Sequence, residues 1–282
     1  RLFPMSPPRG RRVFLESYRL KNIVIIILLI LNLFLASLLL NFRLQGTRAR
    51  QEMMEQLNAL FTSNAISLSD DLDLNAAPLT SLSVHRNLEE ESAIAAMLLG
   101  EAVTAEHQGG GIYSYAGSYG TVHFRSNGNF DYAPVNQRIN DPADFCETFC
   151  ETYGYVPTDP LSSSTDSFTA TQYLGEHAIY NATVTFQFNN GYLIALSGSY
   201  ISSSNTTPVA ASSSLSTVDA LVQLLDYRNE TGVVCNSIQE ILPVYELQSG
   251  PSASLQLTAK WQITADAYQY YVDCSTGAVI RA

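Results

Sequence analysis

Residues 23 to 40 form an apolar run of 18 residues that only Asn32 and Ser37 interrupt. As a helix with a rise of ~1.5 Å per residue, the run reaches about 27 Å, close to the thickness of a bilayer's hydrocarbon core. We therefore expect one transmembrane helix over residues 22–42. A cleaved signal peptide is the alternative, but its apolar region usually has about 7 to 15 residues, and no Ala-x-Ala site follows this run before Arg48.

The charges on the two sides of this run are unequal. Six basic residues precede it and three follow it closely, which places the tail of residues 1–21 in the cytoplasm and the rest outside the cell membrane. Residues 1–50 carry a net charge of +8, whereas residues 51–282 carry −19. An acidic exterior part repels nucleic acids, so we expect a single-pass membrane protein without a nucleic-acid partner.

All four cysteines lie in the exterior part, where oxidation is possible. Cys146 and Cys150 share a helix face at a spacing of four residues. A bond from either to Cys235 or Cys274 is as consistent with the sequence as a local bridge or as none, because four cysteines allow three pairings. The four residues are therefore candidates for disulfide formation without an assigned pairing.

Four exterior segments have the apolar spacing of helices. The first follows the membrane at residues 51–61 and leads into an extended arm at residues 66–84. The second begins at the N-cap Asn87 and ends at Gly100, and the third runs from Asp141 and Pro142 to Gly154. Ser216 or Thr217 caps the fourth helix.

Segments with apolar residues at every second position predict strands between these helices. They form a meander at residues 111–132, then strands near 168–173, 178–188, 192–200, 238–247, 255–263, 268–273 and 279–280, with a flexible Ser/Thr-rich loop at 202–214. We predict an α+β fold: a transmembrane helix, a juxtamembrane helix and arm at 43–86, and two tandem units at 87–160 and 161–282. Each unit is an antiparallel sheet with a helix on one face.

The order of several segments resembles the YycI family, the single-pass accessory proteins of a two-component signalling system, within the wider YycH/YycI-like group. These segments are the short basic tail, the run containing NLFL (32–35), NAISLSDDLDLNAAPLTSLSV (64–84), LLG (98–100), GTVHFRSNGNFDY (120–132), ALVQLLDY, ILPVYEL, AKWQI and YYVDCSTGAVI. The resemblance covers nearly the whole chain and rests on the order and spacing of these segments.

This resemblance implies a non-catalytic regulatory protein that modulates a sensor histidine kinase, together with a YycH-like protein, through transmembrane and extracytoplasmic contacts. Asn32 has an amide that is unpaired in hydrocarbon unless another helix supplies a partner, and such a contact is worth roughly 0.6 to 2 kcal/mol. Asn32 and Ser37 are therefore the candidate transmembrane interaction residues.

The last segment is similar to the final hairpin of PepSY-like domains. The similarity lies in Lys260-Trp261-Gln262-Ile263, Tyr270-Tyr271-Val272-Asp273 and Thr276-Gly277. It implies an alternative function, an extracytoplasmic inhibitor or chaperone of a secreted peptidase, which would act through the exterior part alone.

The sequence contains no complete catalytic, cofactor or metal signature, so we expect no enzyme, cofactor or metal site. Asp71-x-Asp73-x-Asn75 begins like a calcium loop, but Ala76 and Leu82 replace its required Gly and Glu. Cys146 and Cys150 have a poor spacing for zinc, and the four histidines are scattered. An unrecognised hydrolase that uses Cys146, His123 or His177 is the remaining alternative.

Overall fold

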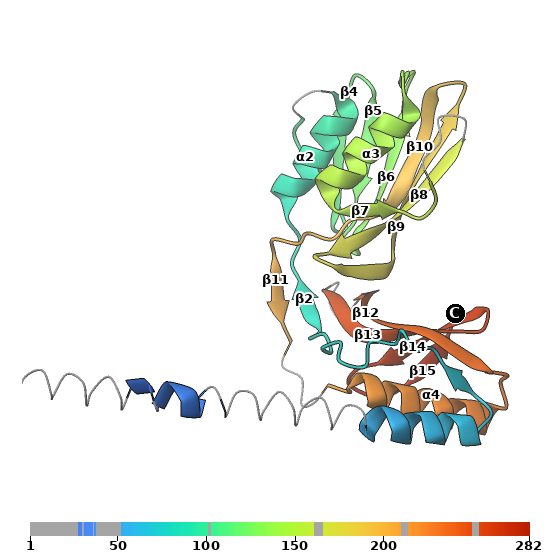
Figure 1. The fold of residues 1–282 in the computed structure, drawn as a ribbon. Coiled ribbons are helices and arrows are strands. Elements are labelled where there is room, and N and C mark those ends of the chain that lie inside the picture. The colour runs from blue at the N-terminus through green and yellow to red at the C-terminus, as the bar shows by residue number, and fades with distance from the viewer. Residues whose placement is uncertain are drawn as a thin grey trace, which may run out of the picture. The chain divides into compact units, whose positions relative to one another are not determined.

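The structure, a computed structural model, describes residues 28–29, 31–35, 37, 52–100, 103–160, 166–209, 214–249 and 254–282 (Figure 1). The chain divides into two units, residues 1–64 and 65–282.

In the first unit, the described residues between 28 and 37 are helical and exposed, and residues 52–63 form a helix. This second segment confirms the helix predicted over residues 51–61, and the Asn64 side chain closes it with a 2.9 Å hydrogen bond to the Leu60 carbonyl. Among the residues described, no helix has both the length and the apolar character needed to cross a membrane. Residues 1–21, 43–51 and most of the predicted span lie outside the described residues, so the anchor stays a prediction.

The second unit repeats one motif three times: a helix followed by a four-stranded antiparallel meander. Module 1 contains α2 (Leu88–Leu99), β3 (Glu106–Gly109), β4 (Ile112–Gly117), β5 (Gly120–Phe124) and β6 (Asn129–Pro134). Module 2 contains α3 (Pro142–Tyr153), β7 (Tyr155–Pro157), β8 (Ser167–Leu174), β9 (His177–Asn189) and β10 (Tyr192–Ser199). Module 3 contains α4 (Thr217–Thr231), β12 (Ser237–Ser249), β13 (Leu255–Ala265), β14 (Tyr268–Asp273) and β15 (Val279–Arg281).

Each of these helices has a side-chain cap at its start and a glycine at its end. The Asn87 side chain accepts hydrogen bonds from two N–H groups of α2, Asp141 does the same for α3, and Ser216 forms a capping box with Asp219 at α4. The helices end at Gly100, Gly154 and Gly232, whose φ angles of 72°, 74° and 70° favour glycine. The predicted helices α2 and α3 are therefore confirmed at both ends, and α4 is confirmed at its predicted start, Ser216.

Modules 1 and 2 share one sheet because their last strands, β6 and β10, pair antiparallel. The strand order is β3-β4-β5-β6-β10-β9-β8-β7. Helices α2 and α3 lie side by side on one face of this sheet (Figure 1) and bury a common core against it. Phe149 of α3 packs edge-on against Phe186 of β9, with 5.2 Å between ring centroids.

In module 3, α4 covers one face of the sheet (Figure 1). Trp261 of β13 is fully buried. The Trp261 indole N–H donates to the Leu215 carbonyl at 2.9 Å, just ahead of the helix. Three short strands complete the sheet: β1 (Ser67–Leu68) runs parallel to β12, β2 (Leu82–Val84) pairs with β13, and β11 (Thr206–Pro208) pairs with β2.

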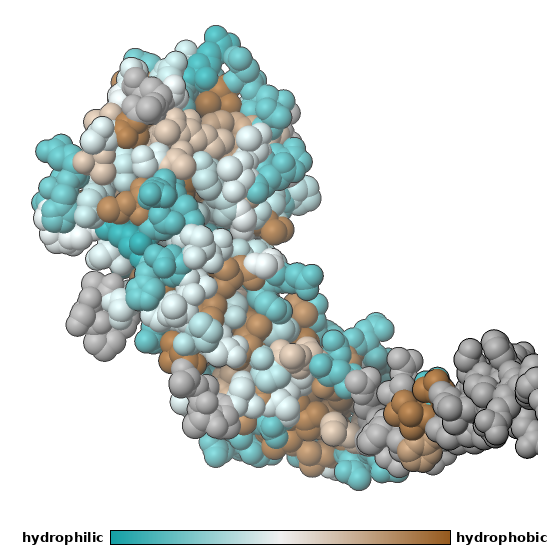
Figure 2. Space-filling view, turned by 90° about the vertical axis from the view of Figure 1, so that its left-hand side faces the viewer, coloured by the Kyte–Doolittle hydropathy of each residue, from teal (hydrophilic) through white to brown (hydrophobic). Residues whose placement is uncertain are grey.

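One bridge, between Tyr245 of β12 and Ile179 of β9, joins this sheet to that of modules 1 and 2. The described strands thus form one mixed sheet of 15 strands in an α+β fold. Hydrophobic and hydrophilic residues are interspersed on the side of the surface drawn in Figure 2.

The observed repeat differs from the two predicted units, since α3 starts a module of its own instead of closing the first unit at residue 160. The sequence obscures this division because β7 is only three residues long. The stretch predicted as a flexible loop at 202–214 also contains β11, whose main chain pairs with β2 although its three residues, Thr-Thr-Pro, include no large apolar side chain.

Candidate functional site

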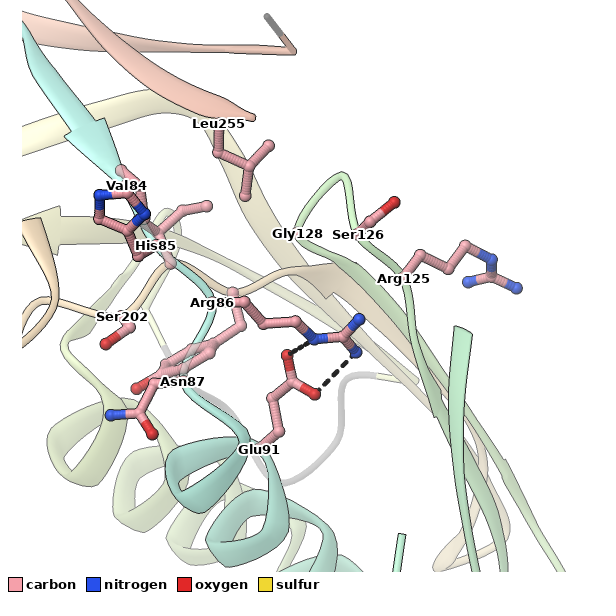
Figure 3. A pocket seen from close by; sticks show the side chains of 12 residues that line it. Val84, His85, Arg86, Asn87, Glu91, Arg125, Ser126, Gly128, Ser202 and Leu255 are labelled. Atoms are coloured by element: carbon pink, nitrogen blue, oxygen red, sulfur yellow. Dashed lines mark hydrogen bonds and ion pairs between the residues drawn. The ribbon is translucent and has the colours of Figure 1, made fainter. Parts of the chain in front are cut away.

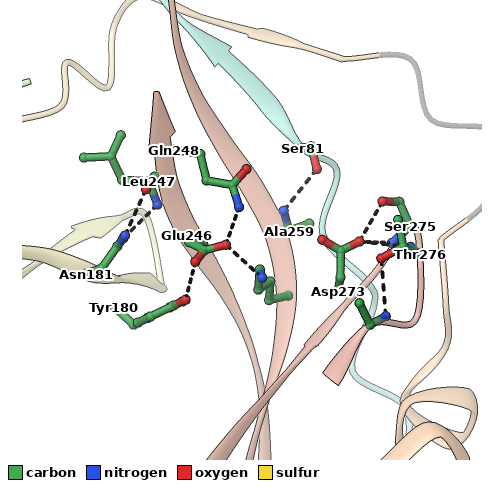
Figure 4. A network of polar contacts seen from close by, with 12 residues as sticks. Ser81, Tyr180, Asn181, Glu246, Leu247, Gln248, Ala259, Asp273, Ser275 and Thr276 are labelled. Carbon is green, nitrogen blue, oxygen red and sulfur yellow. Dashed lines mark hydrogen bonds and ion pairs between the residues drawn. The ribbon is translucent and has the colours of Figure 1, made fainter. Parts of the chain in front are cut away.

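A buried ion pair lies on the face of module 3 that α4 does not cover. Because side chains alternate along β13, Lys260 and Trp261 lie on opposite faces of the sheet. Only 2% of Lys260 is exposed. Its Nζ atom lies 2.8 Å from Oε2 of Glu246 on β12. Tyr180 donates to the other carboxylate oxygen at 2.8 Å, and Gln248 also donates to Oε2 (Figure 4). Burial alone would raise the pKa of Glu246, but these hydrogen bonds and the Lys260 charge hold it below its usual value.

The same cluster joins β9 to module 3. The Tyr180 ring stacks on Tyr271 of β14 with 3.8 Å between centroids, and the Asn181 side chain bonds both the N–H and the carbonyl of Leu247 (Figure 4). Burial and the hydrogen bond to Glu246 raise the pKa of Tyr180, so its hydroxyl stays a donor. The polar groups of this cluster are used in holding the strands together.

A mostly apolar groove of about 460 Å³ lies at the edge of β12. The arm after β1, the β8–β9 hairpin and β12 supply its walls. Leu242 of β12 is 42% exposed there, an unusual exposure for a leucine in the middle of a strand. The lining residues are Asp73, Ala76, Ala77, Pro78, Leu79, Tyr173, Glu176, His177, Ala178, Ile241, Leu242, Pro243, Val244 and Gln262. The volume is in the range that holds ligands in proteins.

The side chains that line a second pocket, around Arg86, also fill most of it (Figure 3). Arg86 forms a two-bond ion pair with Glu91, at 2.6 and 2.8 Å, and donates to the carbonyls of Gly111 and Phe124. Burial raises the pKa of Glu91, and Arg86 opposes this shift. The remaining space of about 20 Å³ holds about one water molecule. The hydrogen bonds of Arg86 therefore connect the start of α2 to the β-meander of module 1.

His123 and Asp131 face each other across β5 and β6 on the helix-free face of module 1. His123 Nδ1 lies 3.2 Å from Asp131 Oδ2, and Arg125 pairs with the same carboxylate. No local pattern in the sequence indicates this cluster, because His123 and Asp131 are eight residues apart in the chain and meet only through strand register. All three side chains are 30% to 42% exposed, which is typical of weak surface pairs.

The structure contains all four cysteines as free, buried thiols. None of the candidate disulfides is formed in it. Cys146 and Cys150 lie in the core shared by modules 1 and 2. Burial raises the pKa of Cys146 and Cys274 to about 12 and that of Cys150 to about 11, and it also raises the pKa of Cys235. Such thiols are poor nucleophiles, which weighs against the hydrolase alternative at Cys146.

The other candidates occupy separate places. Asn32 and Ser37 are exposed on the helical residues of the first unit, and His177 lines the groove. The Asp73 carboxylate accepts the Asn75 N–H at 2.9 Å, so this segment forms a turn. In the described ranges, no three His, Cys, Asp or Glu side chains are arranged so that they could hold a metal ion.

No family model and no curated protein matches the chain. Among solved structures, an uncharacterized protein from Eubacterium rectale is similar over 76% of this chain and 85% of that chain, with 9% identity and a TM-score of 0.39. The Bacillus megaterium YpeB C-terminal domain is similar over 71% of this chain and 98% of that chain, with 9% identity and a TM-score of 0.36. At these scores neither likeness supports a functional comparison, and the YycI assignment stays a prediction.

Proposed function

We propose that this chain is a membrane-anchored, non-catalytic binding protein whose exterior modules bind a secreted peptidase as a PepSY-like inhibitor or chaperone. The groove beside β12 is the observation that carries this proposal. It offers an apolar surface with an exposed leucine, while the nearby ionisable groups Lys260 and Glu246 are held in structural contacts. An exposed apolar surface of this kind is suited to binding another protein.

The hairpin that suggests the PepSY-like similarity also supports this proposal. Residues 260–265 of β13 pair with residues 268–273 of β14, and Asp273 closes the following turn through hydrogen bonds to Ser275 and Thr276. The hairpin packs against α4 through β14.

The test compares the full chain with a version in which an unrelated span replaces residues 23–40. Both are purified from native membranes in mild detergent, bound proteins are identified by mass spectrometry, and the peptidase activity of each preparation is measured with and without the chain. We expect the same peptidase with both versions and a change in its activity or its yield of folded enzyme. Recovery of no peptidase with either version contradicts the proposal.

A histidine-kinase accessory function is the second candidate, and the exposure of Asn32 and Ser37 on helical residues favours it. In that case the sensor kinase and a YycH-like protein bind through the membrane span. This candidate predicts that the kinase is recovered only with the native span, and that Asn32→Leu weakens recovery whereas Leu33→Ile does not. Equal recovery of the kinase with Asn32→Leu contradicts the role of Asn32.

A further inference from the structure

Strand β12 has an interrupted row of partners along one edge. It pairs with β13 nearly from end to end. On its other edge, β1 reaches only Ser237 and Ile238, and β9 reaches only Tyr245. Between these two contacts, in the described part of the chain, residues 239–244 have β13 as their sole strand partner. The sheet therefore has a gap about six residues long at this edge.

The contacts of Leu247 show which main-chain N–H and carbonyl groups of β12 point into this gap. Its N–H and carbonyl bond the Asn181 side chain at 2.8 and 2.9 Å, so they point away from β13. Because this direction alternates along a strand, the N–H and carbonyl of Ile241 and the carbonyl of Pro243 also point away from β13. Pro243 has no N–H to donate, and it occupies a position where β13 requires none.

The groove of about 460 Å³ lies at this gap, since Ile241, Leu242, Pro243 and Val244 all line it. The opposite wall combines apolar side chains such as Pro78 and Leu79 with the acidic residues Asp73 and Glu176. An occupant that satisfies this site needs main-chain hydrogen-bonding groups at the spacing of a strand, small or apolar side chains, and positive charge nearby. An extended peptide with basic residues has all three features.

We propose that the gap beside β12 binds an extended segment of the partner protein, which adds as a strand next to residues 241–243. A main-chain carbonyl of the segment accepts a hydrogen bond from the Ile241 N–H, and N–H groups of the segment donate to the carbonyls of Ile241 and Pro243. Its apolar side chains pack against Leu242. Lysine or arginine residues next to this segment face Asp73 and Glu176. This inference rests on the proposed function, because it assigns the surface through which the peptidase is held.

The test uses the full chain in detergent and a fluorescent probe, the N-acetylated heptapeptide Lys-Thr-Val-Thr-Val-Thr-Lys. A matched probe in which the valines and threonines are all N-methylated keeps the side chains and charges but blocks the main-chain donors on both edges of the peptide. We expect the first probe to bind at least tenfold more tightly than the second and to slow hydrogen exchange of the Ile241 amide. Leu242→Arg, which adds positive charge and bulk, should weaken binding at least tenfold. Ile194→Arg, a control at a 51% exposed strand residue outside the groove, should not.

Equal binding of the two probes, or an Ile241 amide that is already protected in the free chain, overturns the proposal. Protection in the free chain would mean that another segment of the same molecule occupies the gap. The failure of this inference is separable from that of the proposed function. A peptidase that co-purifies equally well with Leu242→Arg and Ile194→Arg supports the function but contradicts the groove as its site.

Discussion

Replacing Lys260 with methionine tests whether the buried ion pair holds module 3 together. Methionine retains most of the apolar length of lysine and removes only the charge. The change leaves the Glu246 carboxylate with the hydrogen bonds from Tyr180 and Gln248 but without a counter-charge. The Glu246 side chain is only 17% exposed, so water compensates little of the lost interaction with the Lys260 charge.

Removing one partner of a buried pair costs about 3 to 5 kcal/mol. We expect about 3 kcal/mol here, because two hydrogen bonds to Glu246 remain. For a unit of this size, that loss lowers the melting temperature by about 6 to 12 °C. The double variant Lys260→Met/Glu246→Gln should recover most of the loss, since it leaves no uncompensated buried charge.

The assay is urea denaturation followed by tryptophan fluorescence. Trp261 is the single tryptophan of the chain and is fully buried on the opposite face of β13 from Lys260, so it reports the unfolding of module 3. Glu240→Gln, an exposed change on β12, is the control and should cost less than about 0.5 kcal/mol. A cost below about 1 kcal/mol for Lys260→Met, or a double variant less stable than either single one, refutes the reasoning.

Four further outcomes are expected. Gly120→Ala should abolish or strongly reduce folding measured by circular dichroism, because a Cβ atom there would lie 2.1 Å from the Ala133 carbonyl oxygen; Gly175→Ala, which has open space, should cost only about 1 to 2 kcal/mol. Ser216→Ala removes the cap of α4 and should cost about 1 kcal/mol in the urea assay. Burial alone would raise the pKa of Asp273, but hydrogen bonds within its turn lower it below 3.8. The stability that this carboxylate supplies is present above about pH 4 and lost as the pH falls further, so Asp273→Asn should reduce the acid sensitivity of unfolding. At pH 8 a maleimide should label the cysteines slowly in the folded chain and fully in urea, and fast labelling of the folded chain contradicts their burial.

Local signals in the sequence predicted most elements of the second unit correctly. Asn87, Asp141 and Ser216 identify helix starts because their side chains satisfy free N–H groups, and Asn190-Gly191 identifies the β9–β10 hairpin, where both residues have positive φ angles. These effects act over a few residues and can be read from a single sequence.

Signals that act over a few residues do not predict which distant strands pair. The contact of Asp131 with Ser197 across β6 and β10 joins residues 66 positions apart, and no periodicity records it. The groove was missed for the same reason, as it requires the arm, the β8–β9 hairpin and β12 to meet. One signal was available: Pro243 lies inside an apolar strand, and proline in such a place indicates an edge.

Because β6 pairs with β10, one edge of β6 has no strand partner until β10 has been synthesised. Module 1 is complete at Pro134, but the strand that covers its last edge ends at Ser199. At roughly 5 to 20 residues per second, a ribosome needs about 3 to 13 s to make the intervening chain. During that interval β6 presents unpaired main-chain groups to every neighbouring nascent chain. Its outward-facing Asp131 and the adjacent Arg125 supply charges that oppose such pairing, so the surface cluster on this sheet is useful before the protein is finished.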